Sequence, residues 1–238
     1  MRHARPLAPG APLDEAIRSE LVPKPGGGTR VLTHLGERDR RLFDRAVAAV
    51  VPAVERELAS GVMANRARAG IPGVELQSWP SARRGFRRQV EAAAAASGAV
   101  FMGDVAECYA SIPAVAVERA LAGLGVDRHD AARVSAVLRS FEERGVRGLP
   151  VGPAPSAVLA NAVLAPVDRA LREAADGPTF RWVDDVVAFA SGRRAAERIA
   201  GAFHRALEDA GLLAHPTKCR VSLWAGDILV GVSPACVP

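Results

Sequence analysis

The stretch that most restricts the fold of this chain is RWVDDVVAFA, residues 181–190. Its aromatic and β-branched residues are typical of a buried β-hairpin, yet Asp184 and Asp185 stand side by side in the middle of it. Charged side chains are almost never fully buried unless they are paired or bind a cation. Adjacent aspartates are also common in solvated turns, so the rest of the chain must decide between these two interpretations.

A third carboxylate follows another apolar run. GAVFMGDV, residues 98–105, is typical of a buried strand that delivers Asp104 at its C-terminal end. If this strand and the hairpin are neighbours in one sheet, the carboxylates converge and repel one another unless they are protonated or neutralised by a cation. Hard oxygen ligands of this kind favour Mg²⁺, and two such ions about 3.5–4 Å apart promote phosphoryl transfer.

Helical periodicity surrounds these strands. The apolar spacing predicts a helix over 39–60 that breaks at Pro52, and further helices over 113–125 and 128–143. LDEAIRSEL, residues 13–21, is also predicted to form a short helix. From residue 98 the order is strand, helices, hairpin, helix and strand, which predicts an α+β fold built on an antiparallel sheet with helices on one face.

Basic charge is concentrated in the N-terminal part. Residues 1–95 hold 16 lysines and arginines against 10 acidic residues, whereas residues 96–238 hold 15 against 16. Such a distribution favours an anionic partner, usually nucleic acid. The densest cluster lies at the start of a predicted helix, where we expect contacts with a nucleic-acid backbone from Arg83, Arg84, Arg87 and Arg88. For any one of these arginines, a solvated helix face is an equally good interpretation.

Cysteine usage and hydropathy bear on the compartment. The three cysteines form no C-x-x-C pair, which argues for a reducing compartment and against a zinc site. The first residues lack the apolar core of a signal peptide, and no apolar run approaches the ~20 residues of a membrane span. We therefore expect a soluble, cytoplasmic protein without a membrane partner.

Four ordered motifs, DVAECYASI, GLPVGPAPSAVLAN, RWVDD and GLLAHPTKC, resemble the palm of reverse transcriptases in sequence and in spacing. The match is closest to the bacterial group related to abortive-infection and other phage-defence enzymes, in which GLP-x-GP-x-x-S and R-[YW]-VDD forms recur. VPKPGGGTRVL and ERDRRLFDRAV resemble the fingers of that family. The resemblance covers most of residues 20–225. It implies a fingers-like region at 1–95 and a polymerase palm at 96–238.

The resemblance also implies catalytic roles. Asp104 and Asp184 would hold two metal ions, Mg²⁺ or alternatively Mn²⁺, with Asp185 assisting and the backbone carbonyl of Val105 as a further ligand. Lys218 matches the lysine proposed to protonate the departing pyrophosphate, which an arginine cannot do because its pKa is too high. Lysine is rare here, since only two of the 31 basic residues are lysines. Both fall on motif positions, which favours an active enzyme.

Five further residues match positions around the incoming nucleotide. Lys24 and Arg30 correspond to the fingers residues that grip the triphosphate. Tyr109 falls where the family keeps an aromatic ring beneath the sugar, and such a ring favours deoxynucleotides. As an alternative, Tyr109 is a core residue, but it is the only tyrosine of the chain. Gly152 would let the backbone pass close to the nucleotide, and Ser156 would face the same cleft.

The expected function is that of an RNA-directed or template-independent DNA polymerase, which transfers dNTPs by two-metal chemistry in a bacterial anti-phage defence system. An RNA-synthesising polymerase and a non-catalytic nucleic-acid-binding or assembly subunit remain alternatives. Expected partners are an RNA template, the DNA product and dNTPs. The chain ends soon after the palm motifs, so we expect a thumb to be absent or minimal, and a thumb-supplying or priming protein partner or a homo-oligomer to compensate.

Overall fold

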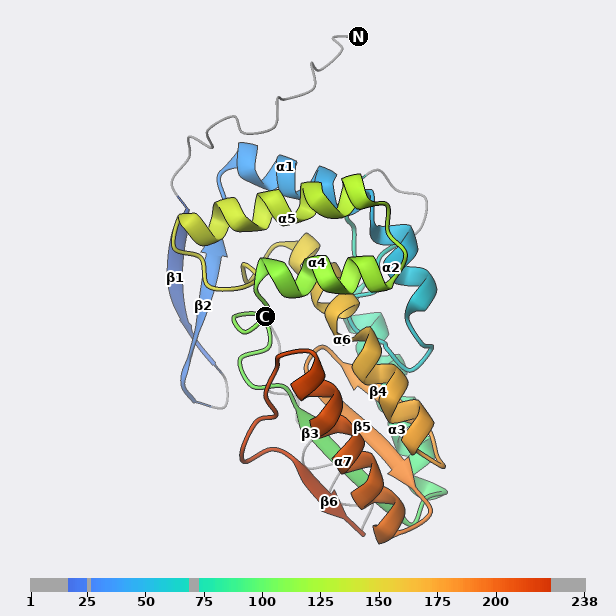
Figure 1. The fold of residues 1–238 in the computed structure, drawn as a ribbon. Coiled ribbons are helices and arrows are strands. Elements are labelled where there is room, and N and C mark those ends of the chain that lie inside the picture. Colours follow the sequence, from blue (N-terminus) through green and yellow to red (C-terminus); the bar gives the residue numbers. More distant parts are fainter. Residues whose placement is uncertain (1–16, 25–26, 69–72, 224–238) are drawn as a thin grey trace.

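The computed structural model describes residues 17–24, 27–68 and 73–223 (Figure 1). It begins with an antiparallel hairpin of β1 (Arg18–Pro23) and β2 (Thr29–His34), in register from Arg18 opposite His34 to Pro23 opposite Thr29. Gly27 and Gly28 take positive φ angles of 91° and 80° at its tip, as the glycine run predicts. The helix expected over 13–21 is wrong for residues 18–21, because these residues pair with β2; residues 13–16 lie outside the described residues.

Two short helices follow the hairpin, α1 (Glu37–Ala48) and α2 (Val51–Glu57). Pro52 stands in the first turn of α2, where its missing N–H leaves no hydrogen bond unmade. The predicted break at this proline is therefore confirmed. A segment without regular helix or strand then leads to α3 (Trp79–Ala95).

The second half contains the larger sheet. Its strands are β3 (Ala99–Asp104), β4 (Thr179–Trp182), β5 (Asp185–Ala190) and β6 (Arg220–Ser222). They are all antiparallel to their neighbours and lie in the order β4-β5-β3-β6, so the central β3 is buried along its whole length. The helices of this half are α4 (Ala114–Gly123), α5 (Arg128–Glu143), α6 (Ala154–Ala174) and α7 (Arg193–Asp209).

Helices cover both faces of this sheet (Figure 1). On one face Phe101 of β3 packs against Phe203 of α7, with ring centroids 5.3 Å apart. On the other face Met102 belongs to a separate apolar cluster with Phe86 and Val90 of α3. The α+β class and the antiparallel sheet are confirmed, and the palm helices that contact the sheet, α6 and α7, lie on one face as expected. The other face is covered by α3, which comes from the predicted fingers-like region. The sequence of α3 contains, among its arginines, an apolar stripe at Phe86 and Val90, one helical turn apart, and this stripe was not recognised as a buried face.

A continuous hydrophobic core joins the helices of the first half to the sheet. It contains α6, which is buried along most of its length and contacts α1, α2, α4 and α7. Phe43 of α1 meets Phe141 of α5 edge to face at 5.4 Å. Beside this pair, the buried Asp39 forms an ion pair with Arg144 at 2.7 Å. The α-helical layer is therefore fixed to the sheet by packing.

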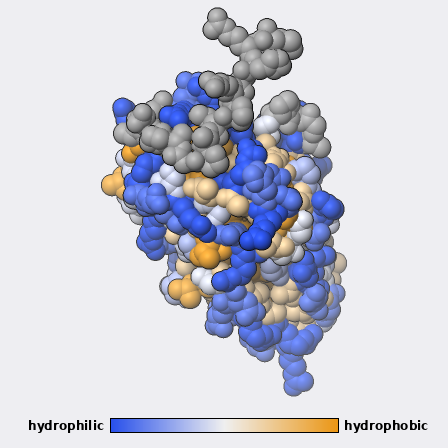
Figure 2. All heavy atoms as spheres, turned by 45° about the horizontal axis from the view of Figure 1, so that its top comes forward, coloured by the Kyte–Doolittle hydropathy of each residue, from blue (hydrophilic) through white to orange (hydrophobic). Residues whose placement is uncertain are grey.

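The surface is largely polar. Figure 2 shows hydrophilic residues over much of the viewed face, with hydrophobic residues between them in smaller areas. Among the described residues, no helix combines the length and the apolar character that crossing a membrane requires. The expected minimal thumb concerns the chain beyond Leu223, and those residues lie outside the described part.

Candidate active site

Strand register brings the three aspartates to one end of the sheet. Asp104 is the last residue of β3 and lies directly opposite Asp185, the first residue of β5. Asp184 lies in the turn before β5, and its carbonyl accepts a hydrogen bond from the amide of Val105 at 3.2 Å. The convergence of carboxylates predicted from the separate strand patterns is therefore present.

The turn that carries Asp184 has an unusual backbone. Val183 has a φ of 59°, in the left-handed region that a β-branched residue rarely adopts. Such a conformation persists only where its surroundings fix it. Here the guanidinium of Arg181 donates from Nη1 to the carbonyl oxygen of Val183 at 2.8 Å. The aspartate turn is thus held from beneath by a buried arginine.

Two carboxylates of this cluster, Asp184 and Asp185, resist ionisation. Burial, followed by the charge of Asp104, raises the pKa of Asp184. Desolvation by the surrounding protein is the largest cause that raises the pKa of Asp185 to about 7, followed by the charges of Asp184 and Asp104. Part of the Asp185 side chain is nevertheless exposed to solvent. The three carboxylates are therefore mutually repulsive at neutral pH, and positive charge nearby would stabilise them.

Lys218 supplies one such charge. Its Nζ lies 2.7 Å from Oδ2 of Asp104, which is only 3% exposed. The segment before β6 is placed by the amide of His215, which donates to the carbonyl of Asp104 at 2.7 Å. Partial burial acts to lower the pKa of Lys218, but the hydrogen bond and charge of Asp104 outweigh it and raise that pKa. The ammonium is therefore kept protonated at the edge of the cluster.

A metal site is incomplete in the protein alone. Among residues 17–24, 27–68 and 73–223, no group of three or more His, Cys, Asp or Glu side chains is arranged to hold a metal ion. Asp104, Asp184 and Asp185 nevertheless fit a hard divalent cation, because they are repelling oxygen ligands on one sheet end. Mg²⁺ commonly keeps several waters and joins few carboxylates to substrate phosphates, so the remaining ligands need not be side chains.

Tyr109 lies beside this cluster under a tight turn. The amide of Leu149 donates to the carbonyl of Tyr109 at 2.8 Å. Gly148 has a φ of 65°, and a Cβ there would lie 2.5 Å from that same carbonyl oxygen, so only glycine fits. The phenol oxygen accepts a hydrogen bond from Nδ2 of Asn65 at 3.3 Å. The Gly148 turn thus contacts the backbone of Tyr109, and Asn65 contacts its hydroxyl.

Comparison with known proteins decides the family. A model described as reverse transcriptase (RNA-dependent DNA polymerase) matches residues 22–230. The chain belongs to the reverse transcriptase family. A search of curated proteins finds no match. Among solved structures, the chain is similar to the telomerase of Candida albicans, solved in complex with a TWJ fragment of telomeric RNA.

The likeness to this telomerase concerns the fold. The TM-score is 0.56 at 12% sequence identity, and the match covers 88% of this chain and 42% of the telomerase chain. The chain therefore spans less than half the length of that structure. These matches confirm the expected palm and fingers fold and membership of the reverse transcriptase family, which is a family of nucleotidyltransferases.

The β1–β2 hairpin brings the charge of Arg30 within electrostatic reach of the aspartates. The guanidinium of Arg30 is close enough for its charge to act on Asp184 and on Tyr109. The hairpin is attached to the Gly152 turn, since the amide of Thr33 donates to the carbonyl of Val151 at 2.8 Å. Lys24 is exposed at the hairpin tip, where it shapes the turn through its backbone.

Two of the predicted site residues, Ser156 and Arg83, have side chains placed differently from the expectation. Ser156 is completely buried, and its hydroxyl has no hydrogen-bond partner among the described residues. It therefore does not line the cleft. Arg83 is half-buried, and its guanidinium lies over the ring of Trp182, 4.9 Å from the ring centroid. The other three arginines of that cluster are exposed and line a shallow depression on the outer face of α3, together with Ser81 and Glu91.

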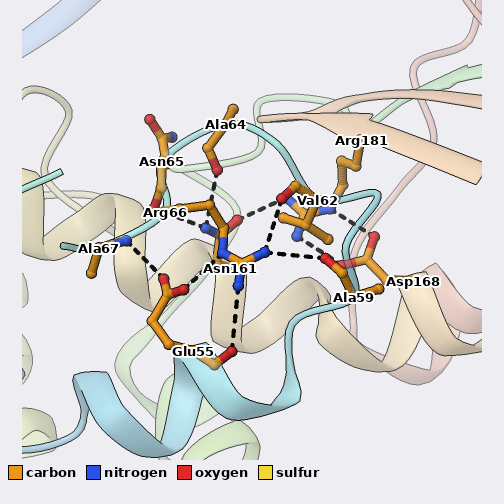
Figure 3. A network of polar contacts seen from close by, with 10 residues as sticks. All are labelled: Glu55, Ala59, Val62, Ala64, Asn65, Arg66, Ala67, Asn161, Asp168 and Arg181. Atoms are coloured by element: carbon orange, nitrogen blue, oxygen red, sulfur yellow. Dashed lines mark hydrogen bonds and ion pairs between the residues drawn. The ribbon is translucent and has the colours of Figure 1, made fainter. Parts of the chain in front are cut away.

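Our sequence-based predictions missed the polar network beneath the site (Figure 3). Arg181 is 2% exposed and forms a bidentate ion pair with Asp168 of α6, with both N–O distances 2.8 Å. Its Nη1 also donates to Oδ1 of Asn161 at 2.9 Å. The available signal was charge inside apolar runs, Asp168 in the long helix and Arg181 in the first strand of the hairpin.

Proposed function

We propose that this chain is an RNA-directed DNA polymerase that adds deoxynucleotides to a primer end by nucleotidyl transfer. The observation that carries the proposal is the register pairing of Asp104 with Asp185, with Asp184 in the adjoining turn. Family membership supports it. A subunit released from catalysis would have no reason to keep clustered carboxylates that repel one another.

Asp104 and Asp184 would hold two divalent cations, Mg²⁺ or Mn²⁺, with Asp185 and the carbonyl of Val105 nearby. Bound there, such ions activate the attacking hydroxyl and stabilise the leaving oxygen. Lys218, kept protonated, would donate its proton to the departing pyrophosphate.

The remaining residues bind and orient the nucleotide. Arg30, whose charge acts on Asp184, would bind the triphosphate as a bidentate donor, with Lys24 adding a point charge from the hairpin tip. Tyr109 would lie beneath the sugar and exclude a 2′-hydroxyl. The turn at Gly152 would approach the nucleotide through its backbone, while Ser156 would act only by supporting this turn from within the core. The exposed arginines of α3 would contact the nucleic-acid backbone.

The experiment measures incorporation of labelled dNTPs and NTPs by the purified chain, with Mg²⁺ or Mn²⁺, with and without a primed RNA template. Metal-dependent dNTP incorporation that an Asp184→Ala, Asp185→Ala variant loses supports the proposal, and dependence on the template separates copying from untemplated addition. A preference for NTPs indicates an RNA-synthesising polymerase. Absence of incorporation under every condition, with retained binding of a primed template, indicates the binding-subunit alternative.

The biological setting is a separate proposal. The GLP-x-GP-x-x-S and R-W-VDD forms favour bacterial anti-phage defence, and this rests on resemblance alone. Loss of phage protection in cells that carry the Asp184→Ala, Asp185→Ala variant would support it, and equal protection would contradict it. A thumb-supplying or priming partner, a second copy of the chain and a cytoplasmic location stay predictions.

A further inference from the structure

Asn65 is the residue that holds the phenol of Tyr109. It lies in the segment between α2 and α3, which runs beside β4 through hydrogen bonds from Arg181 N to Gly61 O at 2.9 Å and from Met63 N to Arg181 O at 3.1 Å. Its side-chain amide donates to the Tyr109 hydroxyl at 3.3 Å. Two sets of polar contacts fix the segment on either side of Asn65 (Figure 3).

The first set attaches the segment to α2. Arg66 pairs with Glu55 through Nε and Oε2 at 2.7 Å, and the other carboxylate oxygen of Glu55 accepts from the amide of Ala67 at 2.7 Å. Nη1 of Arg66 also donates to the carbonyls of Ala59 at 3.2 Å and Val62 at 3.1 Å. This part of the segment is therefore hydrogen-bonded to its own backbone and to α2.

The second set joins the segment to the aspartate turn. Asn161 of α6 donates to the backbone carbonyl of Asn65 at 3.1 Å and accepts from Arg181 at 2.9 Å. The same Nη1 of Arg181 donates to the carbonyl of Val183, next to Asp184. One buried guanidinium thus fixes both the turn that carries an aspartate and the segment that reaches Tyr109.

The backbone at Asn65 suits this role. Its φ is 59°, a left-handed conformation that asparagine and glycine tolerate better than other residues. With the backbone held in this conformation, the side-chain amide meets the tyrosine hydroxyl. A tyrosine ring whose hydroxyl is hydrogen-bonded to a fixed partner has fewer accessible orientations than a ring whose hydroxyl has no such partner.

We propose that Asn65 is a positioning residue for sugar selection, which holds the Tyr109 ring where it excludes a 2′-hydroxyl. The inference rests on the proposed polymerase function, because it assigns a task to Tyr109 in nucleotide binding. Asn65 itself does not touch the nucleotide. It acts through the tyrosine hydroxyl, and Asn161 and Arg181 keep it in place relative to the aspartates.

The kinetic test replaces Asn65 by glycine, which keeps the left-handed backbone and removes the amide. The efficiency of NTP incorporation relative to dNTP incorporation should rise about 3- to 10-fold, the range expected for loss of one hydrogen bond. Tyr109→Phe should give a similar rise, and the double variant should exceed neither single variant, because both remove the same contact. Arg68→Ala, an exposed change in the same segment, should leave the ratio unaltered. Equal losses with both nucleotide types would overturn the proposal.

A second readout does not depend on activity. Tyr109 is the only tyrosine of the chain, so 3-fluorotyrosine labelling gives a single ¹⁹F resonance. Asn65→Gly should shift this resonance, as should Asn65→Asp, which keeps the size of the side chain and removes the amide donor; Arg68→Ala should not. An unshifted resonance in both Asn65 variants would overturn the proposal. If the unmodified chain incorporates no nucleotide, the proposed polymerase function fails, while the resonance still decides whether Asn65 positions Tyr109.

Discussion

The charged guanidinium of Arg181 lies in the interior of the molecule, where the carboxylate of Asp168 neutralises it through two hydrogen bonds. Replacing an ion pair of this kind by apolar residues is often tolerated, but removing one partner leaves an uncompensated buried charge. The pair also places the guanidinium under Val183 and beside Asn161. At the scale of single residues, the stability of the core and the geometry of the site therefore depend on the same contact.

Asp168→Ala should lower the free energy of unfolding by about 3–5 kcal/mol, because Arg181 stays buried without its counter-charge. Urea unfolding followed by circular dichroism measures this. The matched control is the double variant Asp168→Leu, Arg181→Met, which removes both charges and should lose clearly less. A double variant as unstable as Asp168→Ala would show that packing, not the unpaired charge, causes the loss.

The carboxylate cluster should reduce stability when no cation is bound. The pKa of Asp185 is raised from 3.8 to about 7, so the folded chain disfavours the ionised form. This penalty is absent below pH 3.8, grows between pH 4 and 7 and is complete above pH 7. Asp185→Asn should therefore raise the melting temperature in EDTA more at pH 8 than at pH 5. An equal change at both pH values would contradict the repulsion inferred for the cluster.

At the scale of elements, the local sequence pattern was sufficient to predict a helix or strand where its residues follow a single helical or strand period. The hairpin around Asp184, the strand ending at Asp104 and the break at Pro52 were predictable for this reason. β1 was not, because its short sequence also suits a helix and only pairing with β2 selects the strand. The contact between Asn161 and Asn65 joins residues 96 positions apart, so no local pattern could show it. The burial of Ser156 and the stacking of Arg83 likewise depend on packing between elements.

Helix α3 offers a test at this scale. Phe86, 2% exposed, packs against Trp182, with ring centroids 5.4 Å apart. Phe86→Ala should cost about 3–5 kcal/mol of unfolding free energy, since it leaves a cavity between α3 and the sheet. Gln89→Ala, on the exposed side of the same helix, should change it by less than about 0.5 kcal/mol. Equal effects in chemical denaturation would mean that α3 does not seal this face of the sheet.

At the scale of the whole molecule, the excess of basic residues lies in the part that precedes β3. The exposed arginines of α3 are its densest group, and phosphate contacts release counterions. Arg84→Ala with Arg88→Ala should reduce the slope of log affinity against log salt concentration by about 2, measured by fluorescence anisotropy with an RNA–DNA duplex. An unchanged slope would assign these arginines to a solvated helix face.

The division of the chain into two regions at residues 95 and 96 stays a prediction. One hydrophobic core contains residues from both sides of this boundary.

Single-nucleotide extension of a primed RNA template by Asp104→Asn, compared with Asp176→Asn, tests directly whether the aspartate cluster is the active site. Asp176 is an exposed aspartate away from the cluster, and it accepts hydrogen bonds from the amide and the hydroxyl of Ser191. We expect Asp104→Asn to lower the rate about a thousandfold, equivalent to about 4 kcal/mol of transition-state stabilisation, while Asp176→Asn extends at the rate of the unmodified chain. Comparable extension by both variants would contradict the assignment of the aspartate cluster as the active site.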